Sequence, residues 1–427
     1  MKKSFFSNLI VCLLLLLSLN IVFSSFVNAD EESLPDISSP SALLMDYSSG
    51  KILYEKNINE KRYPASLTKI MTAIIVLENC ELSDTATVSY DAVMSLSSGY
   101  VTANLQVGEE LTVEQLLYVL MVGSSNDAAI VLAEHVSGSV ENFATLMNEK
   151  AKELGCTSTN FVNPNGAHDE NHYSTAYDLA LIAKYAMQND TFRTLVSTTF
   201  YTLPTTNKYD REDRIFRTTN SLLQLDNSDR ADNYYYKYAT GIKTGFTTPA
   251  GNCLIASANK NNLELITVVL GAGQTKDGLS QRYLDTLSLF DYGYNTYTLK
   301  EITSSGRVVQ TLNVKNATRN TKKLDAVVEN DIYALMKQAD KDSTVLPEIK
   351  LNDNLKAPIK KGEIIGSVTY TVEGIEYTEN LLANSDVKKS RFLLKLAIFV
   401  IIILLFWMYV KNKKIKSKKQ RLKNKYR

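Results

Sequence analysis

The sequence has few of the residues on which metal, redox and triad enzymes depend. It contains four cysteines and three histidines among 427 residues, and no Cys-x-x-Cys pair. Cys12 lies in an N-terminal apolar run, which leaves Cys80, Cys156 and Cys253 for the folded protein. Three scattered cysteines argue against a zinc ribbon or a dithiol redox site. We expect buried free thiols, with one disulfide left open.

The histidines add little to this. A Ser-His-Asp triad would have to use His135, His168 or His172, and the chain has no Gly-x-Ser-x-Gly elbow. His168 and His172, in the segment HDENH, are a conceivable metal pair, but two loop histidines without a cysteine are weak evidence for a metal. We expect structural hydrogen bonds from both, and neither a metal nor another cofactor.

Acidic residues are absent from both ends of the chain. Residues 1–29 and 388–427 contain 16 of the 47 basic residues and none of the 46 acidic ones, so the body between them has a net charge of −15. Nucleic acid is an unsuitable partner for such a body, because phosphate binding needs clustered Lys and Arg.

The N-terminal run has the pattern of an export signal. Lys2 and Lys3 precede a long apolar segment, and Val27-Asn28-Ala29 has small residues at the −3 and −1 positions of a cleavage site. We therefore expect a secretory signal peptide at 1–29. An uncleaved anchor helix is the alternative, since the apolar segment is long.

A second apolar run, 396–410, has no charged side chain and precedes ten basic residues. With residues 392–394 it is long enough to cross a bilayer if Lys395 reaches the interface. We expect a transmembrane helix within 388–410 rather than an interfacial helix, because no polar face is visible. The positive-inside rule then places the tail, 411–427, in the cytoplasm and the body outside the cell.

The body alternates strand and helix patterns up to about residue 296. Residues 41–57 predict a β-hairpin that turns at 47–50, and 253–270 predict a second one that turns at Asn261-Asn262. Thr112 and Gln115 form a capping box for a helix at 113–122, and Thr175 caps a helix that begins at Ala176. Besides the helix at 113–122, we expect helices at 128–135, 140–154, 176–187 and 280–292. Residues 189–232 are polar and irregular, with a strand-like piece at 200–203.

The composition shifts after residue 296. Short β-rich runs alternate there with Asn, Asp, Gly and Lys, which predicts a small, separate β-domain over 297–387. The runs are at 308–312, 323–328 and 364–372.

The segment PASLTKIMTA (64–73) places Ser66 three residues before Lys69 at the start of an apolar helix. Residues three apart share a helix face, so the hydroxyl and the amine can touch. Burial makes a lysine lose its proton more easily, and a neutral amine could then activate the serine. Alone the pattern is weak, because a solvated serine and lysine on a helix surface also fit it.

Two further motifs bear on this pair. In GSSND (123–127), between two helices, Ser124 can relay a proton and Asn126 can hold a lysine or bind a peptide carbonyl. Helix capping by Asn126 or Asp127 is the simpler alternative.

The other motif is Lys243-Thr244-Gly245, in a strand-like segment. A strand edge can pair with an extended peptide, Gly245 permits close approach, and Lys243 and Thr244 can bind a carboxylate. The backbone amides of Ser66 and Phe246 would form an oxyanion hole. An ordinary edge strand with an exposed lysine is the alternative.

In this order the three motifs resemble the set shared by penicillin-binding proteins and serine β-lactamases. The chain resembles the D-alanyl-D-alanine carboxypeptidases of the penicillin-binding protein 5 type from about Ser41 to Leu382, on the segments YPASLTKIMTA, VGSSNDAA, FVNPNGAHDENHYSTAYDLA, GIKTGFTTPAGNCLIASA and LKAPIKKGEIIG. The resemblance implies an α+β catalytic domain over 30–296, with an antiparallel sheet flanked by helices and an all-helical lobe. A small all-β domain and a C-terminal membrane anchor would follow.

The resemblance also implies roles for the first two motifs. Ser66 would be the acylated nucleophile and Lys69 its base. Ser124 would relay the proton, and Asn126 would position Lys69 and the substrate amide.

For the third motif, the resemblance implies that Lys243 and Thr244 bind the substrate end. Arg282, within RYLDTLSLFDYGY, matches the arginine that holds the terminal D-alanine carboxylate, although a surface arginine is the alternative. Some relatives have a histidine where this chain has Phe246, and several have an amphipathic anchor rather than a span.

The implied activity is that of a membrane-anchored serine carboxypeptidase. It would remove the terminal D-alanine of peptidoglycan stem peptides through an acyl-serine, and β-lactams would acylate it. A class A-type β-lactamase is one rival, but no convincing Glu-x-x-x-Asn stands between the Ser-Ser-Asn and Lys-Thr-Gly motifs. A membrane-bound β-lactam sensor is another, but the tail has no room for a signalling domain.

Overall fold

The computed structural model describes residues 34–225 and 232–425, and the chain divides between Tyr297 and Thr298 into two compact units. Each unit has its own sheets and its own hydrophobic core. The expected signal peptide, 1–29, lies outside the described residues.

The first unit is built on a five-stranded antiparallel sheet with the order β2-β1-β9-β8-β7. Its strands are β1 (Ser41–Asp46), β2 (Ile52–Lys56), β7 (Ala239–Thr247), β8 (Gly251–Lys260) and β9 (Leu263–Ala272). Both predicted hairpins are present. Asn261 and Asn262 have φ values of 54° and 65°, which suits a two-residue type I′ turn between β8 and β9.

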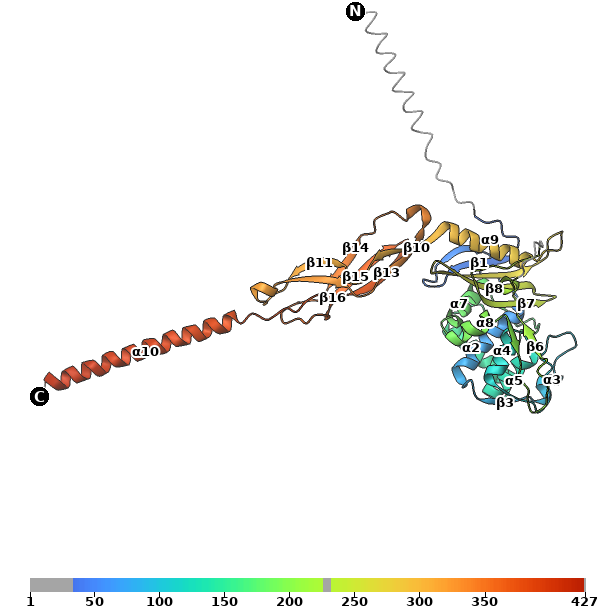
Figure 1. Ribbon diagram of the computed structural model, residues 1–427, viewed down its shortest axis with the longest axis horizontal. Coiled ribbons are helices and arrows are strands. Elements are labelled where there is room, and N and C mark those ends of the chain that lie inside the picture. The colour runs from blue at the N-terminus through green and yellow to red at the C-terminus, as the bar shows by residue number, and fades with distance from the viewer. Residues whose placement is uncertain (1–33, 226–231, 426–427) are drawn as a thin grey trace, which may run out of the picture. The chain divides into compact units, whose positions relative to one another are not determined.

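Helices cover both faces of this sheet (Figure 1). On one face lies α9 (Gln281–Thr296), where Gly293 lets the helix backbone approach Leu44 and Leu265. On the other face lie α7 (Ala176–Ala186) and α8 (Asp190–Ser197). Every residue of β1 is buried, because a strand covered on both faces has no solvent side.

Helix α8 corrects a prediction, because residues 189–232 were expected to be irregular. The Asn189 side chain caps the helix by accepting from the Phe192 amide at 3.0 Å, and Phe192, Leu195 and Val196 are buried. The helix is only two turns long, too short for the apolar spacing to stand out from a polar background.

The helical lobe begins with a 3-10 turn, η1 (Ala65–Thr68). Its other elements are α2 (Lys69–Asn79), α3 (Tyr90–Met94), α4 (Val113–Met121), α5 (Asn126–Ser137) and α6 (Val140–Glu153), with two short ladders, β3 (Thr85–Thr87) with β4 (Glu110–Thr112) and β5 (Phe200–Thr202) with β6 (Ile215–Arg217). The 3-10 turn η2 (Ser221–Leu223) contacts β7.

The structure bears out most of the predicted lobe and moves some boundaries. The capping box of Thr112 and Gln115 is present, with bonds of 2.8 and 3.2 Å. Ser66 lies in the 3-10 turn rather than in the helix that follows. Helix α5 begins at Asn126 rather than Ala128, and α9 continues to Thr296 rather than ending at Tyr292.

The second unit is a β-domain followed by one long helix. A five-stranded antiparallel sheet has the order β11-β12-β16-β15-β14, and β10 pairs with β13. The strands are β10 (Tyr297–Thr303), β11 (Val308–Asn313), β12 (Lys323–Val328), β13 (Ile332–Lys337), β14 (Pro347–Leu351), β15 (Ile364–Val372) and β16 (Ile375–Ala383), with the turns η3 (Arg319–Thr321) and η4 (Gln338–Asp340). The three β-rich runs seen in the sequence are β11, β12 and β15.

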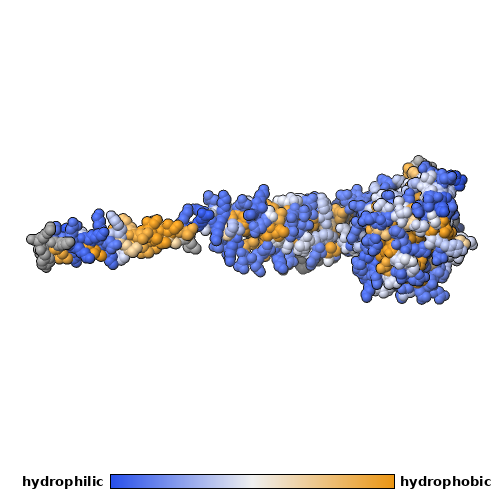
Figure 2. Space-filling view, turned by 90° about the horizontal axis from the view of Figure 1, so that it is seen from below, coloured by the Kyte–Doolittle hydropathy of each residue, from blue (hydrophilic) through white to orange (hydrophobic). Residues whose placement is uncertain are grey.

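Helix α10 (Phe392–Lys425) ends the described chain. An apolar band covers its first half, with hydrophilic residues on either side of the band (Figure 2). By length and composition, residues 394–422 contain a candidate membrane span.

Candidate active site

Ser66 and Lys69 meet at the start of α2, as their spacing predicts. Lys69 Nζ lies 3.0 Å from Ser66 Oγ, and it donates to Asn126 Oδ1 at 2.9 Å and to the Asn165 carbonyl oxygen at 2.7 Å. The lysine is fully buried. Ala65, which enters the turn, has a φ of 49°, a conformation that L-residues adopt only where the surroundings hold it.

The surroundings of Lys69 disfavour its charge. Burial and then the nearby Lys243 lower the pKa of Lys69 well below its ordinary value, and Asp127 only partly opposes them. In the part of the chain that the structure describes, Lys69 makes no ion pair with a carboxylate. These surroundings therefore favour the neutral form of the amine beside the serine hydroxyl.

Ser124 and Lys243 form a second serine–lysine contact. Lys243 Nζ on β7 donates to Ser124 Oγ at 2.9 Å, and both side chains are buried. Ser124 has a φ of 59° in the sharp connection between α4 and α5, which turns its hydroxyl toward β7. Burial, with the charge of Arg282 as a second cause, lowers the pKa of Lys243 to about 7.

Strand β7 lies at the edge of the sheet, as predicted. Gly245 lets this strand approach Ser66 closely, and Gly166 does the same for the loop that contains it. A Cβ on Gly245 would lie 3.0 Å from the Pro64 carbonyl oxygen and 3.2 Å from the Ser66 nitrogen. A Cβ on Gly166 would lie 1.9 Å from the Ala65 carbonyl oxygen, so this position admits only glycine.

Polar groups also gather where β7 meets α9. The hydroxyls of Thr244 and Thr219 are 2.5 Å apart, and Arg282 Nη1 donates to the Gly245 carbonyl oxygen at 3.4 Å. Arg282 Nε is buried without a hydrogen-bond partner among the described residues. Tyr283 anchors this region, because its hydroxyl donates to the Thr219 carbonyl oxygen at 3.0 Å.

These side chains border one cleft of about 540 Å³. Of the residues predicted for the site, Ser66, Ser124, Asn126, Thr244, Gly245, Phe246 and Arg282 line it directly. Lys69 and Lys243 lie behind Ser66 and Ser124. Phe246 is 61% exposed, so its side chain points away from the buried groups. No aspartate or glutamate belongs to the described lining of the cleft.

One wall of the cleft depends on Asp127. Its carboxylate accepts from the backbone amides of Ala103 at 2.9 Å and Leu105 at 3.2 Å. This holds the neighbouring Val101, whose carbonyl oxygen accepts from Asn126 Nδ2 at 2.8 Å. The Asn126 side chain is thus oriented from both sides, with its oxygen on Lys69 and its nitrogen on Val101.

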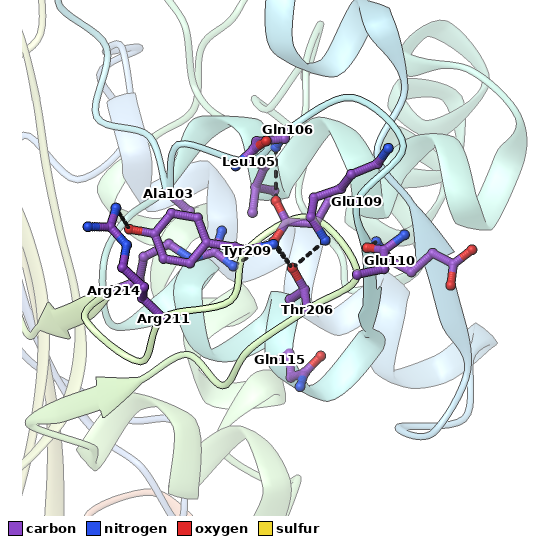
Figure 3. A network of polar contacts seen from close by, with 12 residues as sticks. Ala103, Leu105, Gln106, Glu109, Glu110, Gln115, Thr206, Tyr209, Arg211 and Arg214 are labelled. Carbon is purple, nitrogen blue, oxygen red and sulfur yellow. Dashed lines mark hydrogen bonds and ion pairs between the residues drawn. The ribbon is translucent and has the colours of Figure 1, made fainter.

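The same loop is tied further back by a buried ion pair (Figure 3). Glu109 is fully buried and accepts from Arg214 Nη2 at 2.5 Å, Thr206 Oγ1 at 2.6 Å and the Gln106 amide at 2.9 Å. The guanidinium of Arg214 stacks 4.3 Å from the Tyr209 ring centre. Burial acts to raise the pKa of Glu109, but these hydrogen bonds outweigh it and leave the pKa lowered.

The sequence reasoning missed two contributors to the site. Asn165 accepts from Lys69 through its backbone, and Thr219 comes from the segment expected to be irregular. A backbone acceptor leaves no mark on residue type, so only the conformation of the 163–166 loop reveals it.

The histidines are structural or peripheral. His172 is buried, with Nε2 2.8 Å from Thr68 Oγ1, and its Nδ1 accepts from the Val162 amide, so burial lowers its pKa to about 4. His168 lines the cleft and packs edge-on against Tyr63. The three body cysteines are free thiols, as expected, but only Cys253 is buried, whereas Cys80 and Cys156 are partly exposed.

Two serine–lysine contacts that converge on a sheet edge distinguish the penicillin-binding proteins and serine β-lactamases from other serine hydrolases. Within that class, residues 28–274 match the family model described as D-alanyl-D-alanine carboxypeptidase, and residues 297–389 match the C-terminal domain of penicillin-binding protein 5. The chain belongs to the D-alanyl-D-alanine carboxypeptidase family.

Individual relatives agree over most of the chain. The D-alanyl-D-alanine carboxypeptidase DacF of Bacillus subtilis is 33% identical over 378 residues, which are 87% of this chain and 92% of the relative. Penicillin-binding protein 5 of Haemophilus influenzae is similar in structure, with a TM-score of 0.63, 29% identity and coverage of 84% of this chain and 99% of its own. The Streptomyces K15 DD-transpeptidase matches 61% of this chain and 99% of its own, with a TM-score of 0.55 and 33% identity.

Proposed function

We propose that this protein is a serine D-Ala-D-Ala carboxypeptidase that removes the terminal D-alanine of peptidoglycan stem peptides, with Ser66 as its nucleophile. Its family membership supports the activity, and the surroundings of Lys69 support the choice of serine. A neutral lysine amine has two N–H groups and one lone pair. Asn126 Oδ1 and the Asn165 carbonyl accept the two N–H groups, which leaves the lone pair for the Ser66 hydroxyl.

The positions of the side chains support the following course for the reaction. Ser66 Oγ attacks the carbonyl carbon of the penultimate D-alanine while Lys69 takes the hydroxyl proton. The amides of Ser66 and Phe246 stabilise the negative oxygen that develops, because β7 runs beside Ser66 at Gly245. Ser124, hydrogen-bonded to Lys243, relays a proton to the departing D-alanine nitrogen. Water then hydrolyses the acyl-serine.

The far end of the cleft suits a terminal carboxylate. Arg282 and the paired hydroxyls of Thr219 and Thr244 line the cleft there, Lys243 lies behind Ser124, and no described carboxylate lines the cleft. We propose that these groups bind the carboxylate of the leaving D-alanine, with Asn126 on the substrate amide. Arg282 Nε, buried without a partner among the described residues, gives this end an unused donor.

The absence of an acidic residue from the described lining also bears on the β-lactamase alternative. A class A-type enzyme uses a glutamate to activate the water that releases the penicilloyl group. Without such a base, we expect β-lactams to acylate Ser66 and leave slowly.

We also propose that α10 spans the cell membrane, with the basic tail in the cytoplasm and the catalytic unit outside. The apolar band of α10 and the ten basic residues after it support this orientation.

The test uses the full-length protein and its Ser66→Ala variant. Wild type should release D-alanine from diacetyl-lysyl-D-alanyl-D-alanine, detected by mass spectrometry, and should be labelled by a fluorescent penicillin. Ser66→Ala should do neither, while Ser95→Ala, an exposed serine outside the cleft, should do both. Labelling of the Ser66→Ala variant would refute the choice of nucleophile, and labelling without D-alanine release by wild type would favour a β-lactam sensor.

A further inference from the structure

A second groove, of about 1030 Å³, lies in the C-terminal unit where the β-domain gives way to α10. Seven of the residues lining it are basic: Arg319, Lys360, Lys361, Lys388, Lys389, Arg391 and Lys395. We refer to them as the basic groove. In the described part of the chain, none of the seven side chains makes an ion pair, and the single acidic residue of the lining, Asp386, accepts from the Lys361 backbone amide at 2.9 Å.

The backbone that carries these lysines is fixed to the β-domain. Val387 and Ile359 exchange hydrogen bonds of 2.8 and 3.0 Å. The Thr318 amide donates to the Lys388 carbonyl oxygen at 2.9 Å, and the Ser390 amide donates to Asn316 at 2.7 Å. Helix α10 begins at Phe392, two residues after the last of these contacts. Whatever the tilt of the helix, this end of the β-domain must stay close to the point where the chain enters the membrane.

The charge at this place is unusual for an extracytoplasmic flank. The positive-inside rule disfavours Lys and Arg on the outer side of a span, and here the ten basic residues of the tail must outweigh them. A cluster of unpaired cations next to a bilayer is attracted to anionic lipids, by about 1 kcal/mol for each basic residue near the surface. Phe392, 67% exposed at the groove, can enter the acyl-chain boundary.

We propose that the basic groove binds the headgroups of anionic phospholipids in the outer leaflet, and so holds the end of the β-domain on the membrane surface. The inference rests on the proposed orientation of α10. The groove is a recognition site for lipid phosphate and is separate from the catalytic cleft, which lies in the other unit.

The test places the full-length protein in bilayers of phosphatidylcholine that contain a photoreactive analogue of either phosphatidylglycerol or phosphatidylcholine. After illumination, mass spectrometry locates the crosslinked peptides. Peptides around 360–361 and 388–391 should crosslink to the anionic analogue at least tenfold more than to the neutral one. The tail, 411–427, provides an internal control for insertion, because it meets the opposite leaflet.

Two triple variants with the same change in charge sharpen the test. Lys360→Gln/Lys361→Gln/Lys389→Gln should reduce anionic crosslinking at the groove by about a hundredfold, since three charges at about 1 kcal/mol each are lost. Lys337→Gln/Lys341→Gln/Lys350→Gln, on exposed parts of the same domain, should leave it unchanged. Equal labelling of the groove by both analogues, with normal labelling of the tail, would overturn the lipid site. Loss of labelling from the groove on adding soluble polyphosphate, without any lipid preference, would instead identify a site for a soluble polyanion. Absence of tail labelling would count against the proposed span itself.

An independent observation concerns the helical lobe. Cys80 at the end of α2, Asp84 in the following turn and His135 in the last turn of α5 bring a thiol, a carboxylate and an imidazole within 4.8 Å of one another. Asp84 Oδ2 accepts from the Glu81 amide at 2.9 Å, which holds the carboxylate in place. From the sequence we expect no metal, because the chain has no Cys-x-x-Cys pair and His168 and His172 form only a weak loop pair.

We infer that Cys80, Asp84 and His135 form a site for a thiophilic divalent cation such as Zn²⁺. Zinc binds thiolate sulfur at about 2.3 Å and imidazole nitrogen and carboxylate oxygen at about 2.0–2.2 Å. Atoms within 4.8 Å of one another can therefore supply three ligands of a tetrahedron, with water in the fourth position. The site lies outside the catalytic cleft, so its occupancy is measured directly and not through activity.

Cobalt provides the measurement, because a thiolate–Co²⁺ bond absorbs in the near ultraviolet. Adding Co²⁺ to the reduced, metal-free full chain should produce this band at one equivalent, and Zn²⁺ should abolish it. Cys80→Ser should lose the band and His135→Ala should weaken binding at least tenfold, while Cys156→Ser, a partly exposed cysteine elsewhere, should behave as wild type. Absence of the band from wild type, or its persistence in Cys80→Ser, would overturn the site.

Discussion

Two groups of ionisable side chains in the catalytic unit differ chiefly in the presence of a counter-ion. Glu109 and Arg214 form a closed pair in which a carboxylate meets a guanidinium at 2.5 Å (Figure 3). Lys69, Lys243 and Arg282 form a cluster of three basic residues with no carboxylate paired to any of them among the described residues. Glu109, Arg214 and the two lysines are buried, so the desolvation cost is common to both groups, whereas Arg282 is partly buried and borders the cleft.

This difference explains why the Glu109–Arg214 pair stabilises the structure, whereas the lysine cluster can take part in catalysis. In the Glu109–Arg214 pair, both members stay charged, because the charge of each stabilises the ionised form of the other. In the lysine cluster, burial lowers the pKa of both amines and the neighbouring positive charges lower it further, so the amines lose protons more easily than an ordinary lysine. A buried charge with a partner stabilises the loop, whereas a buried amine without one can act as a base.

The largest effect should follow from removing the amine next to Ser66. Lys69→Met keeps a similar shape without a base, and we expect the rate of acylation by penicillin to fall by roughly 10²–10⁴-fold. Stopped-flow measurement of labelling gives this rate, and Lys152→Met, an exposed lysine on α6, is the matched control. A fall of less than tenfold would mean that Lys69 is not the base.

The second prediction concerns stability, and here we expect the larger loss at Arg214 and the smaller one at Lys69. Arg214→Met leaves Glu109 buried without its counter-ion, so we expect the free energy of unfolding to fall by about 3–5 kcal/mol. Lys69→Met should cost clearly less, because the acceptors that it leaves unpaired, Asn126 Oδ1 and the Asn165 carbonyl oxygen, are neutral. Urea unfolding followed by circular dichroism measures both.

The double variant Glu109→Gln/Arg214→Met checks the cause. It should recover part of the lost stability, since the buried negative charge is gone. If the double variant is less stable than Arg214→Met alone, the ion pair is not the reason for the loss.

The sequence predicts the cluster far better than the pair. Ser66 and Lys69 are three residues apart, so the period of a helix brings them together. Lys243 and Ser124 are 119 residues apart, and only the order of the motifs and the family resemblance related them. Glu109 and Arg214 carry no motif, and their contact depends on how two polar loops fold across 105 residues.

The backbone shows the same contrast between features that local sequence predicts and features that depend on tertiary packing. The hairpins and the capping box follow from local patterns of residues, whereas the edge position of β7 is suggested only by the motif that it carries. Helix α8, the Asn165 carbonyl that holds Lys69 and the position of Thr219 do not, because each depends on tertiary packing rather than on residue type or spacing.

A third prediction uses pH to test whether Lys243 acts as a cation. Its pKa is about 7 because of burial and Arg282, so above pH 7 the amine becomes neutral and loses its attraction for a substrate carboxylate. KM for diacetyl-lysyl-D-alanyl-D-alanine should therefore rise above pH 7, by up to about tenfold per unit, with little change in kcat. At lower pH, kcat/KM should fall as Lys69 gains a proton.

The control for this profile is a substrate without the charge. The peptide amide, which lacks the terminal carboxylate, should show no rise in KM above pH 7. The same rise with both peptides would mean that Lys243 does not bind the carboxylate.

The smallest effect should come from Thr219, a neutral residue beside the cluster of basic residues. Thr219 shares a short hydroxyl contact with Thr244 and has no charge, so Thr219→Val removes a single neutral hydrogen bond, worth about 1 kcal/mol. We expect KM to rise about fivefold with kcat unchanged, measured by D-alanine release, and Thr199→Val, an exposed threonine on the same segment, to have no effect. A fall in kcat instead would indicate that Thr219 acts on the transition state. Thr219 would then contribute to catalysis as the lysines do, and a neutral residue would not be limited to binding the substrate.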